Sequence, residues 1–426
     1  MPHIIPFRGF RYDQGRVDLA DVVAPPYDII SPELQSRLYA KSPYNVVRLI
    51  LGRESDRYSE AAKALQQWQT ENILVRDPTP SIYVLHQTFT TSAGRSMTRK
   101  GFIALCRLEE FEKKIVLPHE KTLSKPLEDR LRLFKSTNAN FSQVLSLYSD
   151  VERSTAELLA QEIKEVPVMD VTFEDVQNRV WQVTEPKTIR AIQETLSQRQ
   201  VFIADGHHRY ETALAYRNWR RGKDKSVSGD EPFEYVMMFF SNFEDEGLVI
   251  EPTHRIVHSL PSFDAPAVLS AIERYFVIHA FGHAAAMKAG LAANHSISFG
   301  LVLRGSPTFY LATLKPTVDG RSLFGKDVPA ALSALDVTIL HQLVLGRVLG
   351  ISAEAQEQKA NIDYVRGFDE AIARMQDGRM QAAFIMNPPK IEQVAAVAEA
   401  GSTMPQKSTY FYPKLLTGLV LNVMAS

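Results

Sequence analysis

Apolar and polar positions follow two different periodicities in the segment that starts near residue 175. RVWQVT, RQVFIAD and EYVMMFFSN are short and apolar, which is typical of strands, whereas PKTIRAIQETLSQ and HHRYETALAYRNWRR carry apolar residues at helical spacing. Strands and helices that alternate along the chain predict an α/β architecture around a central sheet.

The segments on either side of this core mix helices and strands less regularly. Before it, RYSEAAKALQQWQTENIL predicts a helix with an apolar face through Leu65 and Trp68, and SIYVLHQTFTT and RKGFIALCRL predict a hairpin. After it, DVTILHQLVLGRVLG predicts a helix and SISFGLVLRGSPTFYLATLK a pair of strands. The fold is therefore expected to be α+β overall, with an N-terminal region over 1–174, a core over 175–260 and a C-terminal region over 261–426.

Composition and charge exclude several classes of protein. Lys and Arg number 48 against 49 Asp and Glu, which argues against a broad basic face for nucleic acid. Cys106 is the single cysteine, so an internal disulfide framework and a cysteine zinc cluster are excluded. The N-terminus lacks a signal-peptide pattern, and the apolar tail LLTGLVLNVMAS is shorter than the roughly 20 residues that span a bilayer. We expect a soluble, cytoplasmic protein without a membrane or disulfide partner, and the sequence leaves its oligomeric state open.

The joint between VFIAD and the following helix carries the strongest candidate chemistry. Asp205 and Gly206 end the strand, and His207, His208 and Arg209 open the helix. The first N–H groups of a helix lack intrahelical partners, and the helix dipole is positive there. Gly206 lets an anion approach the backbone, and Arg209 offers a planar fork to phosphate oxygens. These features predict a phosphate-binding turn; in the alternative interpretation Asp205 only caps the helix and the histidines are solvated.

The segment DGHHRYETA resembles the signature of the ParB/sulfiredoxin superfamily, in which a turn of this kind holds nucleotide phosphates. The resemblance covers about residues 178–258 and implies a mixed sheet with helices. Sulfiredoxins carry Gly-Cys-His-Arg-Tyr-Glu, and His207 stands in the place of their reactive cysteine, which argues against sulfinic acid reduction. Partition proteins of the superfamily use the turn as a nucleotide switch, and its free-serine kinases have a turn similar to residues 205–209.

Along the full chain the sequence resembles the bacterial and archaeal family called domain of unknown function 1015. The landmarks are VVAPPYDIISPE, LPHEKTL, LEDRLRLF, ADGHHRYETAL, GLVIEPTHRIV and MPQKSTYFYPKLLTGL. These landmarks run from one end of the chain to the other.

Two further segments offer acidic groups. The stretch from His119 to Arg130 is densely polar, which suggests a loop that faces a site. His119 and Glu120 can supply a general base, and Glu120 can bind Mg²⁺. Asp28 takes the position of an N-terminal acidic residue in the free-serine-kinase branch. The alternatives are an exposed charged loop and a rigid Pro-Pro turn.

Other basic groups can supplement the phosphate site. Arg130 belongs to the polar stretch, and His254 with Arg255 repeats the His-Arg pairing in EPTHRIV. In the aromatic tail, Lys407 and Ser408 can clamp a second phosphate or a carboxylate. The alternatives are a structural ion pair at 254–255 and an aromatic core segment in the tail.

The resulting hypothesis is a nucleotide-dependent phosphotransferase that acts on a small hydroxylated metabolite, with a free-serine-like amino acid as the leading candidate. ATP or ADP and Mg²⁺ are the expected cofactors, and Asp205 and Glu120 are the expected metal ligands. Two alternatives stay open: a phosphatase of a small phosphoester, and a nucleotide-binding switch without metabolite chemistry. The expected catalytic residues are Asp28, His119, Glu120 and Asp205. The expected phosphate-binding residues are Gly206, His207, His208, Arg209, Arg130, His254, Arg255, Lys407 and Ser408.

Overall fold

The computed structural model describes all residues except 123, 165, 224–227, 320–323, 325–327 and 425–426. By the density of contacts along the chain, the molecule divides into two compact units. Unit 1 consists of Met1–Pro118, Thr122–Val249 and Pro413–Ser426, and unit 2 consists of His119–Lys121 and Ile250–Tyr412.

Unit 1 is built on a mixed sheet, to which the described residues contribute nine strands in the order β6-β11-β8-β12-β5-β4-β10-β9, with β1 paired to β5. β11 runs parallel to β6 and antiparallel to β8, and β8 runs parallel to β12. The strands are β1 (Ile4–Ile5), β4 (Ile82–Thr90), β5 (Ser96–Arg107), β6 (Val116–Leu117), β8 (Val144–Tyr148), β9 (Met169–Phe173), β10 (Val176–Val183), β11 (Val201–Asp205) and β12 (Tyr235–Asn242).

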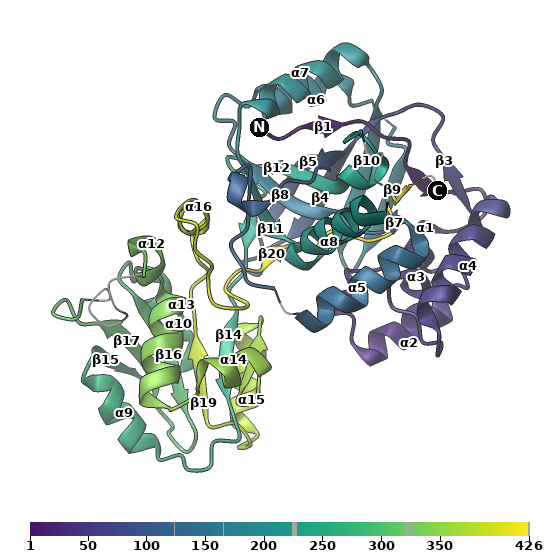
Figure 1. The fold of residues 1–426 in the computed structure, drawn as a ribbon. Coiled ribbons are helices and arrows are strands. Elements are labelled where there is room, and N and C mark those ends of the chain that lie inside the picture. The colour runs from purple at the N-terminus through teal and green to yellow at the C-terminus, as the bar shows by residue number, and fades with distance from the viewer. Residues whose placement is uncertain (123, 165, 224–227, 320–323, 325–327, 425–426) are drawn as a thin grey trace. The chain divides into compact units, whose positions relative to one another are not determined.

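Helices pack around this sheet (Figure 1), with α6 beside α7 and α5 beside both α4 and α8. Helix α4 buries Leu65 and Trp68, and β4 and β5 form an antiparallel pair, so both sequence predictions are confirmed. The helices are α1 (Leu19–Val22), η1 (Tyr27–Ile29), α2 (Pro32–Lys41), α3 (Val47–Ile50), α4 (Arg57–Thr70), η2 (Phe111–Lys113), α5 (Ser124–Thr137), α6 (Ser154–Glu162), α7 (Pro186–Ser197), α8 (His207–Lys223) and η3 (Pro232–Glu234).

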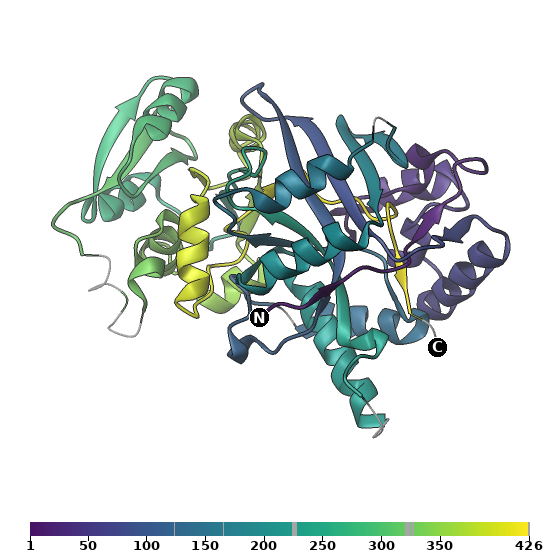
Figure 2. The ribbon, with the colours of Figure 1, turned by 90° about the horizontal axis from the view of Figure 1, so that it is seen from above.

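The first strand and residues 413–424 both belong to unit 1, where the letters N and C of Figures 1 and 2 mark the chain ends. Strand β21 (Asn422–Val423) pairs with β7 (Ala139–Asn140), and Leu421 forms a bridge with Phe10. A further small sheet joins β2 (Phe10–Tyr12) to β3 (Leu74–Arg76). The C-terminal residues therefore complete the core of a unit that begins with the first strand.

Unit 2 contains an antiparallel sheet in the order β15-β17-β16-β19-β14-β18. One face packs against α9, η4 and α16, and the other packs against α10 and α15. The strands are β14 (His254–Val257), β15 (Phe276–Phe281), β16 (Ser298–Leu303), β17 (Phe309–Leu314), β18 (Ile362–Val365) and β19 (Ala382–Ile385). The helices are α9 (Ala265–Glu273), α10 (Ala284–Ala293), α12 (Ala330–Ser333), α13 (Asp336–Ile339), η4 (Leu340–Val348), α14 (Ala353–Gln358), α15 (Phe368–Gln376) and α16 (Ile391–Glu399).

Three expectations change. The polar stretch after His119 is not a loop throughout, because α5 forms there and buries Arg130, Leu133 and Phe134. The expected helix over DVTILHQLVLGRVLG forms as α13 followed by η4, which is a π-helix. The three regions expected from the sequence do not coincide with the two units, since strands on both sides of residue 175 share one sheet.

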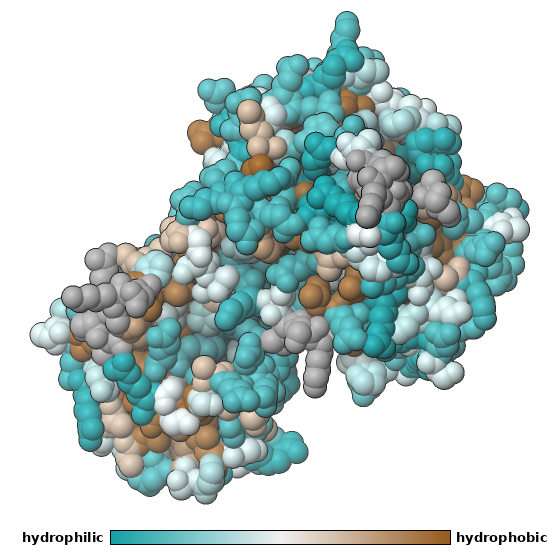
Figure 3. Space-filling model, viewed as in Figure 1, coloured by the Kyte–Doolittle hydropathy of each residue, from teal (hydrophilic) through white to brown (hydrophobic). Residues whose placement is uncertain are grey.

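The surface in view in Figure 3 is mainly hydrophilic, with small separate apolar areas. Cys106 is fully buried, and burial raises the pKa of its thiol to about 12. Within the described part of the chain, no helix combines the length and apolar character needed to cross a membrane.

Candidate functional site

The turn between β11 and α8 has the geometry that its sequence predicts. Gly206 has φ of +93°, in the left-handed region that favours glycine. A Cβ atom at this position would lie 2.8 Å from both Nε and Cζ of Arg209. Glycine is therefore required both by the backbone and by the guanidinium that folds over it.

Asp205 orients this turn through two cations. Its Oδ2 accepts a hydrogen bond from Arg209 at 2.8 Å, and its Oδ1 accepts one from Lys414 Nζ at 2.7 Å. Arg209 also donates to the backbone carbonyl of Gln143. The side chains of Arg209, Asp205 and Lys414 are only 12%, 21% and 11% exposed, so solvent screens these ion pairs weakly.

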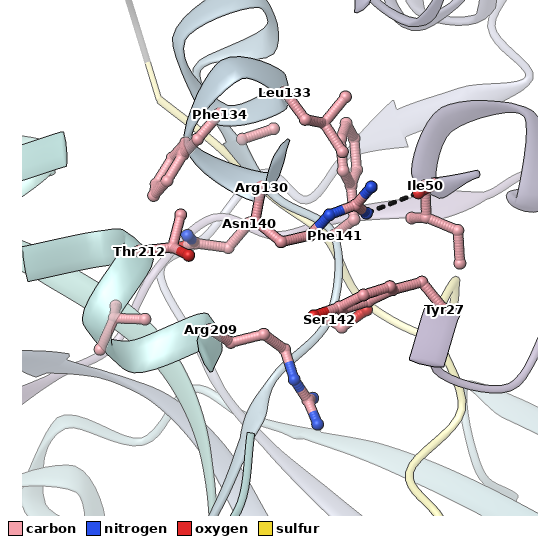
Figure 4. Close-up of a pocket in the computed structure, with 12 residues that line it drawn as sticks. Tyr27, Ile50, Arg130, Leu133, Phe134, Asn140, Phe141, Ser142, Arg209 and Thr212 are labelled. Carbon is pink, nitrogen blue, oxygen red and sulfur yellow. Dashed lines mark hydrogen bonds between the residues drawn. The ribbon is translucent and has the colours of Figure 1, made fainter. Parts of the chain in front are cut away.

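A hollow with about 520 Å³ of empty space lies beside the first turns of α8 (Figure 4). Two arginines, Arg130 and Arg209, line it, and no Asp or Glu is among its described lining residues. The lining consists of Tyr27, Ile50, Arg130, Leu133, Phe134, Ala139, Asn140, Phe141, Ser142, Arg209, Thr212 and Val236. A hollow with this charge distribution favours an anionic ligand.

A network behind the hollow fixes Arg130. Its Nε donates to Asp129 at 2.8 Å, and its Nη1 donates to the carbonyl of Ile50 at 2.6 Å. Burial opposes ionisation of Asp129, but the Tyr58 hydroxyl, Arg130 and Arg57 outweigh it and lower the pKa of the carboxyl group. Asp129 therefore stays charged and holds Arg130 in place.

Tyr27 lies between the two arginines in Figure 4. The Arg130 guanidinium carbon is 4.2 Å from the centre of its ring. Burial raises the pKa of the Tyr27 phenol, although both Arg130 and Arg209 lower it in part. The ring is thus a neutral, cation-flanked wall of the hollow.

Polar side chains of the lining are also oriented by neighbours. Asn140 accepts from the backbone N–H of Met237 at 3.3 Å and from Asn422 at 3.1 Å through its Oδ1. Because the Oδ1 atom is occupied, the amide N–H groups of Asn140 are the groups that can donate to a ligand in the hollow. Figure 4 shows this nitrogen directed toward Thr212. The Thr212 hydroxyl donates to the carbonyl of His208 at 2.6 Å.

The other predicted residues of unit 1 lie near the hollow without lining it. His207 is buried and His208 half-buried in the first turn of α8, and neither belongs to the lining. Asp28 lies in η1 next to Tyr27 and is exposed. Their phosphate-binding and catalytic roles stay predictions.

The remaining predicted residues belong to unit 2. His119 shares a 2.9 Å hydrogen bond with the hydroxyl of Thr409. Glu120 accepts from the backbone N–H of Lys407 at 3.3 Å, and the carbonyl of His119 accepts from the N–H of Met404 at 2.8 Å. Landmarks almost 300 residues apart, LPHEKTL and MPQKSTYFYPKLLTGL, therefore meet in unit 2.

His254 and Arg255 do not form one site. They are consecutive residues of β14, and consecutive strand residues point to opposite faces of a sheet. His254 lies edge-on to Phe368, and burial lowers the pKa of its imidazole to about 4. Arg255 donates to His341 in η4 and, together with Ser408, lines a different hollow.

The described residues offer no ready-made metal site. No group of three or more His, Cys, Asp or Glu side chains among them is arranged to hold an ion. The two predicted ligands belong to different units, Asp205 to unit 1 and Glu120 to unit 2. Both oxygens of Asp205 accept from cations, which supports its predicted role as the residue that orients the turn rather than its role as a metal ligand.

The sequence predictions missed several residues of this site, among them Lys414 and Tyr27. Lys414 lies in the aromatic tail that the sequence did single out, but 209 positions after Asp205. Tyr27 directly precedes Asp28 in the Pro-Pro-Tyr-Asp turn. Both segments could be identified from the sequence, whereas their side-chain partners could not.

The family model described as "Protein of unknown function (DUF1015)" matches residues 4–338, and the chain belongs to this family. Among curated proteins, none matches. Three solved structures show a likeness. A conserved hypothetical protein from Pyrococcus furiosus is 15% identical over 74% of this chain and 92% of its own, with a TM-score of 0.35. A free serine kinase in complex with AMP is 14% identical over 72% and 86%, with a TM-score of 0.36. SbnI from Staphylococcus aureus, with a C-terminal truncation, is 8% identical over 74% and 85%, with a TM-score of 0.34.

Proposed function

We propose that the hollow beside the Gly206 turn binds the phosphate groups of a nucleotide, and that the protein is a nucleotide-dependent phosphotransferase for a small hydroxylated metabolite. The observation that carries the proposal is the pair of arginines, Arg130 and Arg209, that line a hollow with no Asp or Glu among its described lining residues.

The arginines are pre-oriented from behind. Asp129 holds Arg130 and Asp205 holds Arg209, so each guanidinium is fixed on one side before a ligand arrives. Guanidinium groups bind phosphate oxygens through paired, charge-assisted hydrogen bonds. Phosphoryl transfer depends mainly on positioning and charge stabilisation, and fixed donors supply both without reorganisation during the reaction.

The assignment of a metabolite kinase rests on the sequence of the turn. Residues 205–209 resemble the turn of free-serine kinases, for which a free-serine-like amino acid is the substrate class. In unit 1 the candidate general base is Asp28, because it is exposed and adjacent to Tyr27. Mg²⁺ would enter together with the nucleotide, since this ion usually binds through substrate phosphates and only one or two carboxylates.

A phosphotransfer assay tests the proposal. The protein is incubated with ATP or ADP, Mg²⁺ and a panel of small hydroxylated amino acids and hydroxy acids, and phosphorylated products are identified by mass spectrometry. We expect one acceptor to gain phosphate, and we expect Arg130→Met to lower kcat/KM by at least about tenfold, equivalent to about 1.4 kcal/mol.

The matched control is Arg132→Met on the same helix, because Arg132 is 61% exposed and pairs only with Glu128 among the described residues. This variant should retain activity. Nucleotide binding without transfer to any acceptor would instead support a switch, and release of phosphate from a small phosphoester would support a phosphatase. Absence of nucleotide binding would overturn the proposal.

A further inference from the structure

Arg255 is a buried charge without an opposite partner. It is 1% exposed on β14, and it forms no ion pair with an Asp or Glu among the described residues. Burial lowers the pKa of its guanidinium to about 10. A buried cation of this kind is destabilising unless something compensates its charge.

The protein groups that bond Arg255 are neutral. Its Nε donates to His341 Nε2 at 3.0 Å, one terminal nitrogen donates to the carbonyl of Thr253, and the other to the carbonyl of Lys407 at 3.2 Å. His341 Nδ1 donates to Gln356 Oε1 at 2.8 Å, so its Nε2 is the acceptor. Burial lowers the pKa of His341 to about 3, and its imidazole stays uncharged at neutral pH.

These contacts leave donors unused. A guanidinium carries five N–H groups, and the described contacts occupy three of them. Each terminal nitrogen therefore keeps one N–H group without an acceptor among the described residues. Such donors on the two terminal nitrogens suit the oxygens of a carboxylate or a phosphate.

A hollow with about 350 Å³ of empty space, open solvent included, borders Arg255 and is also lined by a carboxyl group. This group belongs to Asp336, which forms no ion pair within 4 Å with a described residue. Burial raises the pKa of its carboxyl group to about 7. Backbone hydrogen bonds from Ser298 and from Asp336 itself, and the positive charge of Lys390, lower the pKa only in part. The complete described lining is Thr253, Arg255, Leu335, Asp336, Val337, Met386, Asn387, Pro388, Pro389, Gln393 and Ser408.

We propose that this hollow binds a small free amino acid, with its carboxylate on Arg255 and its ammonium group on Asp336. A zwitterion places an opposite charge beside the buried Arg255 and the half-buried Asp336 at once, whereas a phosphate dianion would bring two negative charges beside Asp336. The apolar lining residues, which include Leu335, Val337 and Met386, suit a small uncharged side chain.

The winding of the neighbouring helix supports a ligand site at this position. His341, which orients Arg255, is the second residue of the π-helix η4. π-Helical turns are rare and occur frequently at functional sites. The site consists of unit 2 residues alone and does not depend on the function proposed for unit 1.

Ligand binding to the full chain tests this proposal. The standard amino acids, propionate and inorganic phosphate are each screened by thermal shift at millimolar concentration, and the responding compound is titrated by calorimetry. We expect an uncharged amino acid to raise the melting temperature, with no response to phosphate. Arg255→Met should weaken its binding at least about thirtyfold and Asp336→Asn at least about tenfold.

The matched control is Arg379→Met, because Arg379 is 80% exposed and pairs with Asp377. This variant should bind like the natural protein. If Arg255→Met does not fold, Arg255→Lys replaces it, and the loss of the planar fork should still weaken binding. The proposal is overturned if no amino acid responds, if the variants bind equally well, or if propionate or phosphate binds as well as the amino acid.

Discussion

Gly206 is the residue on which the phosphate-binding turn depends. Its φ of +93° is unfavourable for any residue with a Cβ atom, and a Cβ there would collide with the Arg209 guanidinium at 2.8 Å. Gly206→Ala should therefore destabilise unit 1 by about 1–2 kcal/mol and weaken nucleotide binding by displacing Arg209. Urea unfolding and a nucleotide titration measure the two effects.

Gly222 provides the matched control within the same helix. It lies near the end of α8, and a Cβ at this position would have no neighbour within 4 Å. Gly222→Ala should leave nucleotide binding unchanged and stabilise the protein by roughly 0.5–1 kcal/mol, since alanine favours a helix more than glycine does. Equal effects of the two substitutions would contradict the role given to Gly206.

At the scale of residues, the sequence predicted the turn but not its supports. Asp205, Gly206 and Arg209 are neighbours in the chain, so their chemistry could be recognised together. Lys414 and the Asp129 network reach the site only through the fold. A single sequence contains no signal for such long-range pairs, even where the segments themselves stand out.

At the scale of elements, α5 shows why the helical pattern was weak. Its buried positions include Arg130 and Thr137 beside Leu133 and Phe134. An arginine buries a long aliphatic stem, so a buried helix face can contain a charged residue that dilutes the apolar periodicity. The dense polar groups that suggested a loop are thus partly the network that fixes Arg130.

The histidines of β14 and η4 make the stability of unit 2 dependent on pH. Burial lowers the pKa of His254 to about 4 and of His341 to about 3, below the ordinary value of 6.5. As the pH falls below about 6.5, the unfolded state gains protons that the folded state does not, so stability decreases. At about pH 5 each histidine should remove roughly 1–2 kcal/mol of the unfolding free energy.

Urea unfolding at neutral pH and at about pH 5 measures this loss. His341→Gln keeps an amide oxygen that can accept from Arg255 but cannot titrate in this range. On acidification the variant should lose less unfolding free energy than the natural protein. The difference should equal the contribution of His341. The same pH dependence in both proteins would contradict the buried, neutral imidazole.

At the scale of the whole molecule, unit 1 depends on its last residues. Five apolar residues in this segment are at most 5% exposed: Leu415, Leu416, Leu419, Val420 and Leu421. Burial of each stabilises by about 1.5–3 kcal/mol, and the sum is comparable with the total stability of a domain. Removal of residues 413–426 should therefore abolish the unfolding transition of unit 1.

Leu419→Ala offers a milder form of the same experiment, with an expected loss of about 2–5 kcal/mol in urea unfolding. Its control is Val277→Ala in unit 2, because Val277 is 41% exposed and its truncation should change stability by less than about 0.5 kcal/mol. A shortened chain that still unfolds in the unit 1 transition would show that these contacts are dispensable.

The division into units could not be derived from the order of predicted elements. Strand β5 pairs with β12 across more than 120 residues, which joins the expected N-terminal region to the expected core. The segment at His119 leaves unit 1 for three residues only, and the chain returns to unit 1 after Tyr412. Element types follow from local periodicity, whereas such pairings follow from packing between distant segments.

A calorimetric titration of ATP and ADP against the natural protein and Arg209→Lys tests the central claim most directly. Lysine keeps the positive charge that Asp205 pairs with but loses the planar fork, so binding should weaken at least about tenfold while the melting temperature stays close to that of the natural protein. Arg132→Lys, at an exposed position of α5, should bind normally. Equal nucleotide affinity in Arg209→Lys and the natural protein, or no binding by the natural protein, would contradict a phosphate site at this turn.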